Sequence, residues 1–429
     1  MSEELYPDFT IARLGECRIP SPLKLGRFTR DDQRVLFHTG LASMQYFIAE
    51  GKEPPSMEIA GPREKIYFDP SKLKCCIVTC GGICPGLNDV IRAIVLSLFH
   101  HYGVKKVFGL KYGYEGLSYR YGHEPMELNP DNVEGINEKG GTILGSSRGN
   151  QDVVEMVDTL EQMNIGLLFT IGGDGTLKGA RAISEEVTRR GLKIGVIGIP
   201  KTIDNDILYI EKSFGFETAV AEAQRATYAA NVEAIGARNG VGLVKLMGRE
   251  SGFISAFTVL CDSNVNFCLI PEAPFTLEGF ISALRERVEK RGHAVVIVAE
   301  GAGQNLLQET GEQDASGNVK FADIGLFLKS SITKHFREHG VELNLKYIDP
   351  SYTIRSLPSN AHDSAFCLLL GHNAVHAGMT GRTNVVVGFS HGTFTHVPIP
   401  LAVSGRKKID PESWLWSSVL STTGQARDL

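Results

Sequence analysis

The chain has 429 residues, about three times the usual length of one domain, so we expect two domains plus extensions. Hydrophobic residues make up 42% of it, charged residues 22%, and the net charge is −5, which excludes a disordered chain and a general nucleic-acid surface. No apolar run approaches the roughly 18 residues of a membrane span, and the acidic start is unlike a signal peptide. With neither a transit peptide nor a terminal SKL, and too few cysteines for a disulfide scaffold, we expect a cytoplasmic protein without membrane partners.

Strand and helix patterns alternate along most of the chain. Residues 1–72, with many prolines and charges, predict an extension draped on the first domain, and residues 309–318 predict an exposed loop. Strands are predicted at Cys75–Thr79, Lys106–Leu110, Leu167–Ile171, Gly195–Ile199, Leu243–Met247, Ala294–Ala299 and Val385–Gly388, and helices at Leu87–Tyr102, Phe216–Asn231 and Gly279–Arg291. This alternation predicts an α/β protein with parallel sheets, whose ligands lie at the carboxyl ends of the strands.

Glycine doublets follow several of these strands, and glycine reaches 47 of 429 residues, against an average of about 7%. The first doublet lies in Thr79–Gly86, between a strand and a helix. Backbone N–H groups exposed there can bind a phosphate at the helix N-terminus, although such turns also serve packing alone. Cys75 and Cys76 point to opposite faces of a strand, which disfavours a metal site.

Two further glycine-rich segments carry one charged residue each. In Gly140–Gly149, Arg148 can present its guanidinium to phosphate oxygens, or it can be a solvated loop residue. In Gly172–Thr176, directly after an apolar strand, Asp174 is a carboxylate among glycines. That setting suits Mg²⁺ held together with nucleotide phosphates better than a plain Asp-Gly turn.

A pair of carboxylates stands in Pro200–Asp206. In an extended segment Asp204 and Asp206 lie on one face, so one of them is a plausible general base for a hydroxyl nucleophile. An Asp/Asn turn after a proline is the structural alternative.

Two more strand ends complete a sugar-phosphate site. In Met247–Gly252, Arg249 could bind a phosphate, and in Glu300–Gly303, Glu300 could accept a hydrogen bond from a sugar hydroxyl. Each is ambiguous alone, but the set describes phosphoryl transfer, which depends on positioning and on neutralising charge with Mg²⁺, Lys and Arg.

The ordered motifs GGxCPG, GGTxLGSSRG, GGDGT, PKTIDND, MGRESG and AEGAG closely resemble those of the 6-phosphofructokinase family. The resemblance covers residues 74 to about 390 and, with the extension and Tyr347–Tyr352, is strongest to the ATP-dependent plant and trypanosomatid enzymes. It implies two Rossmann-like three-layer domains with mostly parallel sheets. The implied division is 1–72 as the N-terminal extension, 73–215 plus about 360–410 as the larger donor domain, 216–359 as the smaller fructose 6-phosphate domain and 411–429 as a C-terminal tail.

The resemblance also implies a role for each site residue. Asp204 is similar to the family's base, which takes the proton of the fructose 1-hydroxyl with Thr202, Asp206 and Arg249 assisting, and Asp174 resembles the Mg²⁺ ligand. The groups around the phosphoryl donor are matched by Gly82, Arg148, Gly173, Asp174, Gly175, Thr176 and Lys201. The fructose 6-phosphate contacts are matched by Thr202, Asp204, Met247, Gly248, Arg249, Glu300, Lys346, Tyr352 and Arg355. Tyr352 replaces a His of bacterial relatives, and Lys346 replaces an Arg that reaches across from a neighbouring subunit.

Two residues bear on the choice of donor. Family members that use pyrophosphate usually have an Asp where Gly175 stands, and its bulk and charge would oppose the α-phosphate and ribose of ATP. Lys201 is usual in pyrophosphate enzymes but also occurs in the plant and trypanosomatid ATP enzymes. The direct steric argument favours ATP, with the pyrophosphate-dependent enzyme as the alternative.

Other protein classes fit the motifs less well. The GGDGT turn also occurs in NAD and diacylglycerol kinases, but these lack PKTIDND and MGRESG. A non-catalytic regulatory subunit of the same fold has no physical need for the clustered carboxylates. The resemblance therefore implies an allosteric glycolytic kinase that phosphorylates fructose 6-phosphate in a cleft between its domains, as a homotetramer or a dimer.

Overall fold

The computed structural model describes residues 6–307 and 321–429, so the loop expected at 309–318 lies outside the described residues. The chain divides into two compact units. Unit 1 comprises the chain up to Thr202, Ile207–Gly215 and Pro358–Gly405, and unit 2 comprises Ile203–Asp206, Phe216–Leu357 and Arg406–Leu429. Within the described ranges, every helix is too short or too polar to cross a bilayer.

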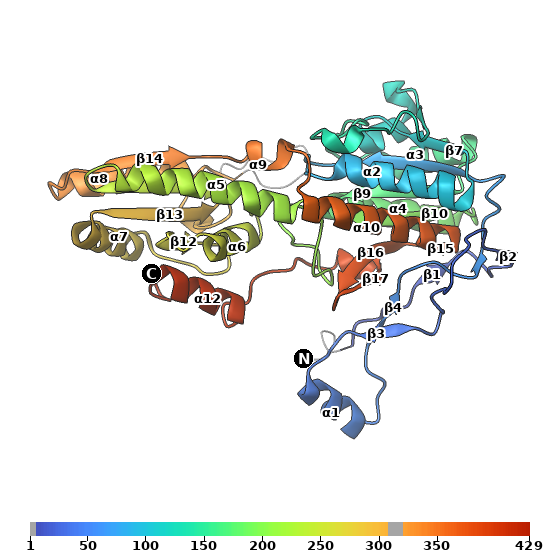
Figure 1. Cartoon of the computed structure of the whole chain (residues 1–429), viewed down its shortest axis with the longest axis horizontal. Coiled ribbons are helices and arrows are strands. Elements are labelled where there is room, and N and C mark those ends of the chain that lie inside the picture. Colours follow the sequence, from blue (N-terminus) through green and yellow to red (C-terminus); the bar gives the residue numbers. More distant parts are fainter. Residues whose placement is uncertain (1–5, 308–320) are drawn as a thin grey trace. The chain divides into compact units, whose positions relative to one another are not determined.

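Unit 1 is built on a nine-stranded sheet (Figure 1). Across the sheet the strands are β3 (Arg34–Leu36), β4 (Ser56–Ile59), β17 (Thr393–Pro398), β16 (Val385–Ser390), β10 (Gly195–Pro200), β9 (Leu167–Gly172), β6 (Lys74–Thr79), β7 (Lys106–Gly109) and β8 (Met126–Leu128). The strands from β16 to β7 run parallel, and the outer ones are antiparallel. The strands β9 and β10 are buried along their whole length, which explains their unbroken apolar sequence.

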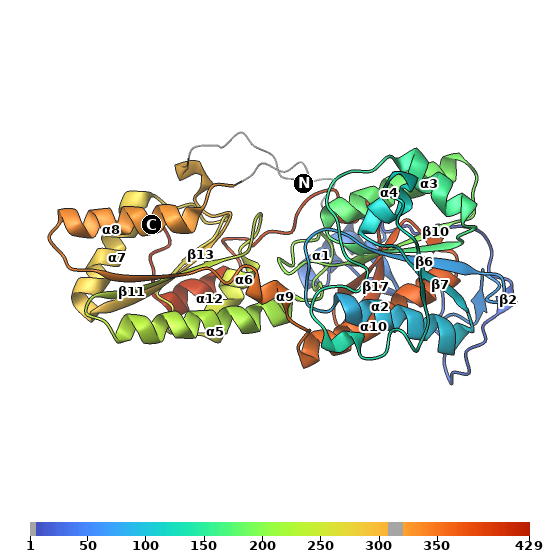
Figure 2. The same cartoon turned by 90° about the horizontal axis from the view of Figure 1, so that it is seen from above.

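Helices cover both faces of this sheet (Figure 2). On one face α2 (Leu87–Leu96) packs against α10 (Ala361–Met379), and on the other α3 (Val153–Gln162) packs against α4 (Asp174–Arg189). The helix expected at 87–102 changes at Ser97 into a π-helix (Ser97–Tyr102). The smaller elements of unit 1 are β1 (Ala12–Arg13), β2 (Ile19–Pro20), α1 (Leu41–Ala49), β5 (Lys65–Ile66), β15 (Arg382–Thr383) and α11 (Ile399–Ala402).

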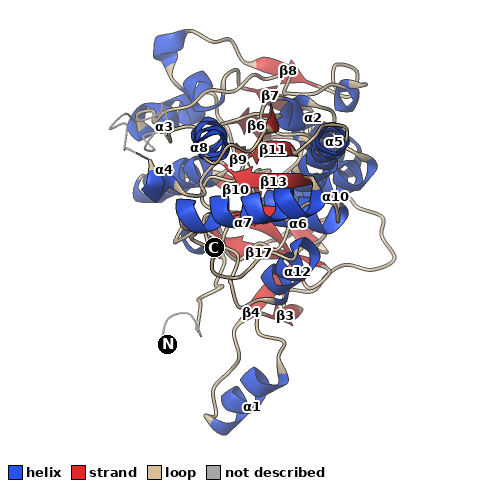
Figure 3. Cartoon of the chain, turned by 90° about the vertical axis from the view of Figure 1, so that its left-hand side faces the viewer, coloured by secondary structure: helices blue, strands red, loops and turns tan. Residues whose placement is uncertain are grey.

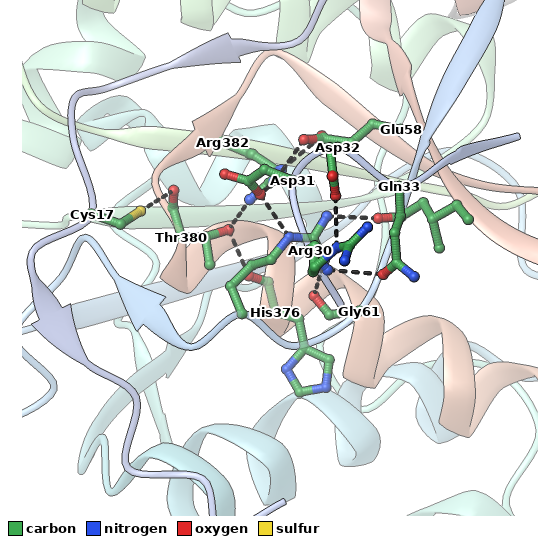
Figure 4. A network of polar contacts seen from close by, with 12 residues as sticks. Cys17, Arg30, Asp31, Asp32, Gln33, Glu58, Gly61, His376, Thr380 and Arg382 are labelled. Carbon is green, nitrogen blue, oxygen red and sulfur yellow. Dashed lines mark hydrogen bonds and ion pairs between the residues drawn. The ribbon is translucent and has the colours of Figure 1, made fainter. Parts of the chain in front are cut away.

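The N-terminal extension is part of unit 1 and adds β3 and β4 to the main sheet. A buried ionic network holds it there (Figure 4). Arg382, which is 1% exposed, donates to both carboxylate oxygens of Glu58, at 2.8 and 2.6 Å, and to Asp31 at 2.9 Å. Arg63 also pairs with Asp31, and His396 contacts Glu58. Burial opposes ionisation of Glu58, but hydrogen bonds from Arg382 and His396 hold its pKa far below the ordinary value.

Unit 2 has a parallel four-stranded sheet in the order β12 (Phe267–Leu269), β13 (His293–Ala299), β11 (Gly240–Leu246) and β14 (Asn344–Ile348). The helices α5 (Phe216–Ile235) and α8 (Ile324–Glu338) lie on opposite sides of β11 (Figures 2 and 3). The remaining helices are α6 (Phe253–Cys261), α7 (Leu277–Arg291), α9 (Thr353–Ser356) and α12 (Trp414–Thr423). An α/β fold with mostly parallel three-layer units is confirmed, and each strand and helix predicted after Lys74 is present.

The end of the chain differs from the expected tail. Residues 406–429 belong to unit 2, where α12 packs against α6. Leu415, Trp416 and Val419 are buried, so one face of this short helix forms part of a hydrophobic core. The larger unit correspondingly ends at Gly405, before the expected boundary near 410.

Candidate active site

The loop between β6 and α2 has a backbone that requires glycine. Gly86 has a φ of 95°, and a Cβ built on it would lie 2.6 Å from the Sγ atom of Cys367. Gly81 has a φ of 84°. The turn therefore leads directly from a buried strand into the N-terminus of a helix, where backbone N–H groups remain available to an anion.

The segment Gly140–Gly149 is held against this loop. The backbone N–H of Gly81 donates to Ser147 O at 3.0 Å, and Ser146 Oγ donates to Gly81 O at 2.6 Å. Thr79 Oγ1 donates to Gly145 O at 2.7 Å. The structure thus brings together two motifs that are about sixty residues apart in the sequence, and Arg148 is an exposed residue of the second.

The GGDGT turn begins α4. Gly172 ends β9, and a Cβ on it would lie 2.1 Å from Thr176 Oγ1, so the helix can start this close to the strand only with glycine there. Gly173 is the N-cap residue. The Asp174 carboxylate lies 2.9 Å from the Lys178 ammonium, and its side chain is 10% exposed. A Cβ on Gly175 would meet no atom within 4 Å, which leaves open space beside it.

Lys201 connects these loops. It is buried, its Nζ atom donates to Gly82 O at 2.7 Å, and its backbone N–H donates to Gly172 O at 3.0 Å. Thr202, the next residue, accepts a hydrogen bond from Ser213 Oγ at its carbonyl oxygen. All the predicted donor residues therefore lie on the loops at the carboxyl ends of β6, β9 and β10, or, for Arg148, on the segment packed against them.

The chain then passes into unit 2 with Ile203–Asp206. Desolvation is the main cause that raises the pKa of Asp204 well above its usual value, and the negative charges of Asp206 and Glu300 add to it. Asp206 is buried, and its carboxylate lies 2.8 Å from Arg406 Nη1. A carboxyl group with a raised pKa beside a second carboxylate has the electrostatics of a general base.

Two glycine-rich loops of unit 2 pack against each other beside Asp204. A Cβ on Gly301 would lie 1.9 Å from Arg249 O, and Gly301 N donates to Gly248 O at 3.1 Å. Gly248 has a φ of 129°, which few other residues adopt. Ser251 Oγ donates to Asp204 O at 3.3 Å. The strands β11 and β13 thus deliver Met247, Gly248, Arg249 and Glu300 to the edge of the sheet where Asp204 lies.

Positive groups surround Glu300. Its burial raises its pKa, and Arg249, Lys245 and Arg355 act in the opposite direction. The Arg249 guanidinium lies 4.3 Å from the ring centroid of Phe321, and Arg355 lies 4.8 Å from that of Tyr352. In this arrangement the arginines can bind a phosphate, and the carboxylate of Glu300 can accept a hydrogen bond from a hydroxyl group.

Lys346 lies apart from the strand-end loops in the register of its sheet. It is exposed on the edge strand β14, in register with Gly242, and its assignment to fructose 6-phosphate, by likeness to an Arg that reaches across from a neighbouring subunit, stays a prediction. The sequence reasoning also missed Arg406 and Glu272, whose carboxylate accepts hydrogen bonds from Gly252 N and Ile409 N. The only sequence pattern that could have pointed to Arg406 is the run of basic residues that it begins after an apolar stretch. No sequence pattern pointed to Glu272.

The phosphofructokinase family model matches residues 74–378, well over half of the chain. The chain belongs to the phosphofructokinase family. An ATP-dependent 6-phosphofructokinase of Borreliella burgdorferi is 49% identical to it, over 97% of both chains. A Trypanosoma cruzi enzyme of the same name is 47% identical over 87% of this chain and 78% of its own. The resemblance predicted from the motifs is therefore confirmed, and the protein is a kinase that transfers phosphate to a hydroxyl group.

Solved structures agree with this fold. The crystal structure of a pyrophosphate-dependent phosphofructokinase from Marinobacter aquaeolei matches 82% of this phosphofructokinase and 91% of its own chain, with a TM-score of 0.67. At 18% identity this similarity establishes the shared architecture alone.

Proposed function

We propose that this phosphofructokinase transfers the γ-phosphoryl group of MgATP to O1 of D-fructose 6-phosphate, giving fructose 1,6-bisphosphate and ADP. The observation that carries the proposal is the pair of carboxylates Asp204 and Asp206 in unit 2. The PKTIDND segment contains this pair and also Lys201, which belongs to the donor loops of unit 1. The curated relatives that match nearly the whole chain are named for ATP as the donor, which supports the same reaction.

Asp204 acts as the general base. It accepts the proton of the fructose 1-hydroxyl while O1 bonds to the γ-phosphorus and the bond from that phosphorus to the β,γ-bridging oxygen breaks. The carboxylate of Asp206 keeps Asp204 a stronger base than an ordinary aspartate. Arg249 binds the sugar phosphate and Glu300 accepts a hydrogen bond from a sugar hydroxyl, with Met247 and Gly248 leaving room for them.

The loops of unit 1 hold the donor. Backbone N–H groups near Gly82 and Gly173 and the side chains of Lys201 and Arg148 bind phosphate oxygens. Asp174 would hold Mg²⁺: it is one shielded carboxylate at a helix N-terminus, which fits an ion that takes most of its ligands from phosphates and water. When bound, Mg²⁺ supplies neutralisation of phosphate charge.

Gly175 supports ATP over pyrophosphate as the donor. The space beside it is open, so the α-phosphate and ribose of a nucleotide meet no side chain there. An Asp at this position would fill that space with a carboxylate and repel the α-phosphate. A Cβ at this position meets no atom within 4 Å, so the substitution Gly175→Asp tests donor choice at a site with open space for the start of the side chain.

The test is formation of fructose 1,6-bisphosphate by the purified protein with Mg²⁺, fructose 6-phosphate and either ATP or pyrophosphate as sole donor. We expect product with ATP only, and loss of it in both Gly175→Asp and Asp204→Asn. Gly26→Asp adds the same charge at another open glycine, in the extension, and should leave the rate unchanged. Activity with pyrophosphate would contradict the donor assignment, and an active Asp204→Asn variant would contradict the base.

We also propose a cytoplasmic protein. Its assembly as a homotetramer, or a dimer, under allosteric control is proposed from the family resemblance alone. Light scattering of the purified protein would report the oligomer. A sigmoidal dependence of the rate on the concentration of fructose 6-phosphate would indicate allosteric control.

A further inference from the structure

The C-terminal segment Arg406–Ile409 contacts Asp206 at two points. Arg406 Nη1 lies 2.8 Å from Asp206 Oδ2, and Lys407 N donates to Asp206 O at 2.9 Å. The Arg406 side chain is 31% exposed and that of Asp206 is 6% exposed, so the pair is largely shielded from water on the carboxylate side. The segment therefore fixes both the backbone and the charge of Asp206.

Glu272 anchors the same segment to the loop that carries Arg249. Its carboxylate accepts hydrogen bonds from Ile409 N at 2.9 Å and from Gly252 N at 3.0 Å. The Lys407 ammonium lies 5.2 Å from the ring centroid of Phe253, the first residue of α6. A segment held at both of its ends can keep a side chain in one orientation, which is what precise positioning in a site requires.

The charges around Asp204 show what Arg406 does electrostatically. The charged groups that face Asp204 are Asp206 on its own segment, Glu300 after β13 and Arg406 from the C-terminal segment, and the backbone of Arg249, after β11, also hydrogen-bonds to it. The two carboxylates oppose its ionisation, and Arg406 favours it. Removing Arg406 would leave two buried negative charges beside a base that must itself ionise.

We propose that Arg406 is a positioning residue that holds the Asp206 carboxylate in place beside the base Asp204. This inference rests on the proposed function, in which Asp204 takes the proton. It assigns the C-terminal segment to the acceptor site, although no motif of that site lies in it. Arg406 acts through Asp206, so its loss changes the chemical step more than substrate binding.

The first test compares Arg406→Gln and Arg406→Lys with the unaltered protein. For Arg406→Gln we expect kcat to fall about tenfold or more, the KM of fructose 6-phosphate to change less than about threefold, and the acid limb of the kcat–pH profile to move to higher pH. Arg406→Lys keeps the charge and should restore most of kcat. Arg427→Gln removes an arginine that pairs with exposed Glu412 in the same C-terminal region and should have no effect.

A double-mutant cycle separates positioning from a general loss of structure. If Arg406 acts through Asp206, the Asp206→Asn/Arg406→Gln protein, measured at a pH above its acid limb, should be no slower than Asp206→Asn alone, whereas additive losses there would overturn the inference. An active unaltered protein whose Arg406→Gln variant keeps its kcat within about twofold and its acid limb in place would also overturn it, with the proposed function intact. An unaltered protein that forms no fructose 1,6-bisphosphate would overturn both.

Discussion

The Lys201 ammonium donates a 2.7 Å hydrogen bond to the carbonyl oxygen of Gly82, so a buried cation lies against the backbone of the first glycine-rich loop. The backbone N–H of Lys201 donates to Gly172 O, which ties the same residue to the strand before Asp174. Lys201 is thus hydrogen-bonded to both of the loops that we assign to the phosphoryl donor. A charge-assisted hydrogen bond of this kind is roughly twice as strong as a neutral one.

Lys201→Met should therefore weaken donor binding. Losing one such bond costs about 1.5 to 3 kcal/mol, so kcat/KM for ATP should fall about tenfold to a hundredfold. The KM of fructose 6-phosphate should change little. Lys72→Met, which removes a lysine whose side chain is 85% exposed, is the matched control and should behave like the unaltered protein. A KM effect confined to fructose 6-phosphate would contradict the assignment of Lys201 to the donor.

The pH dependence of the rate should reflect the raised pKa of Asp204. A base works only when it is ionised, so kcat should decline on the acid side at a pH well above the usual range for carboxyl groups. Asp206→Asn removes a negative neighbour and lowers the pKa of Asp204, so the acid limb should move to lower pH. The measurement is kcat at saturating substrates across about pH 5 to 9. If the acid limb of the kcat–pH profile does not move in Asp206→Asn, the ionisation of a group other than Asp204 sets it.

Asp204 should also reduce stability at alkaline pH. Its pKa is raised above 3.8 on folding, so its contribution to stability is present below that value and is lost as the pH rises through the pKa of the folded state. Asp204→Asn imitates the protonated form, so it should increase the free energy of unfolding at pH values well above the usual carboxyl range. Urea unfolding at about pH 8 and about pH 4 checks this, since the difference should vanish at the lower pH.

The strand-end loops could be predicted from the sequence because each is contiguous and combines glycine with one charged residue after an apolar run. In a parallel sheet the carboxyl ends of such strands meet at one edge, so Asp174, Lys201 and Gly82 come together without further information. The same rule applied to unit 2 predicts that Arg249 and Glu300 lie together, and the contact between Gly301 and Arg249 agrees.

Other parts could not be predicted in this way. The strands β3, β12 and β14 have three to five residues, which is too short to show a period, and β3 pairs only with neighbours in the extension. Arg406 lies two hundred residues after Asp206 in the sequence and has no motif around it. Both residues belong to unit 2, and a contact between segments so far apart in the sequence is not reported by local patterns.

The buried pair of Glu58 and Arg382 should stabilise the attachment of the N-terminal extension. Each of the two side chains is at most 3% exposed, so removing Arg382 takes the buried cation from Glu58 and leaves it only His396 and the partly exposed Arg13. Arg382→Met should lower the free energy of unfolding by about 3 to 5 kcal/mol in urea. Arg30→Met breaks an exposed pair with Asp32, in which both side chains are about 70% exposed, and should cost less than about 1 kcal/mol. Equal costs for the two variants would mean that the network does not hold the extension.

Gly86 and Gly175 should respond oppositely to alanine. At Gly86 the backbone has a φ of 95° and the added Cβ would lie 2.6 Å from Cys367 Sγ, so Gly86→Ala should lower the free energy of unfolding by about 1 to 3 kcal/mol. At Gly175, in the first turn of α4, the Cβ meets nothing within 4 Å, and the alanine removes conformational freedom from the unfolded chain. Gly175→Ala should therefore add up to about 1 kcal/mol. Thermal unfolding of the two variants and the unaltered protein tests this prediction. A Gly86→Ala variant as stable as the unaltered protein would mean that the loop between β6 and α2 can rearrange beside α10.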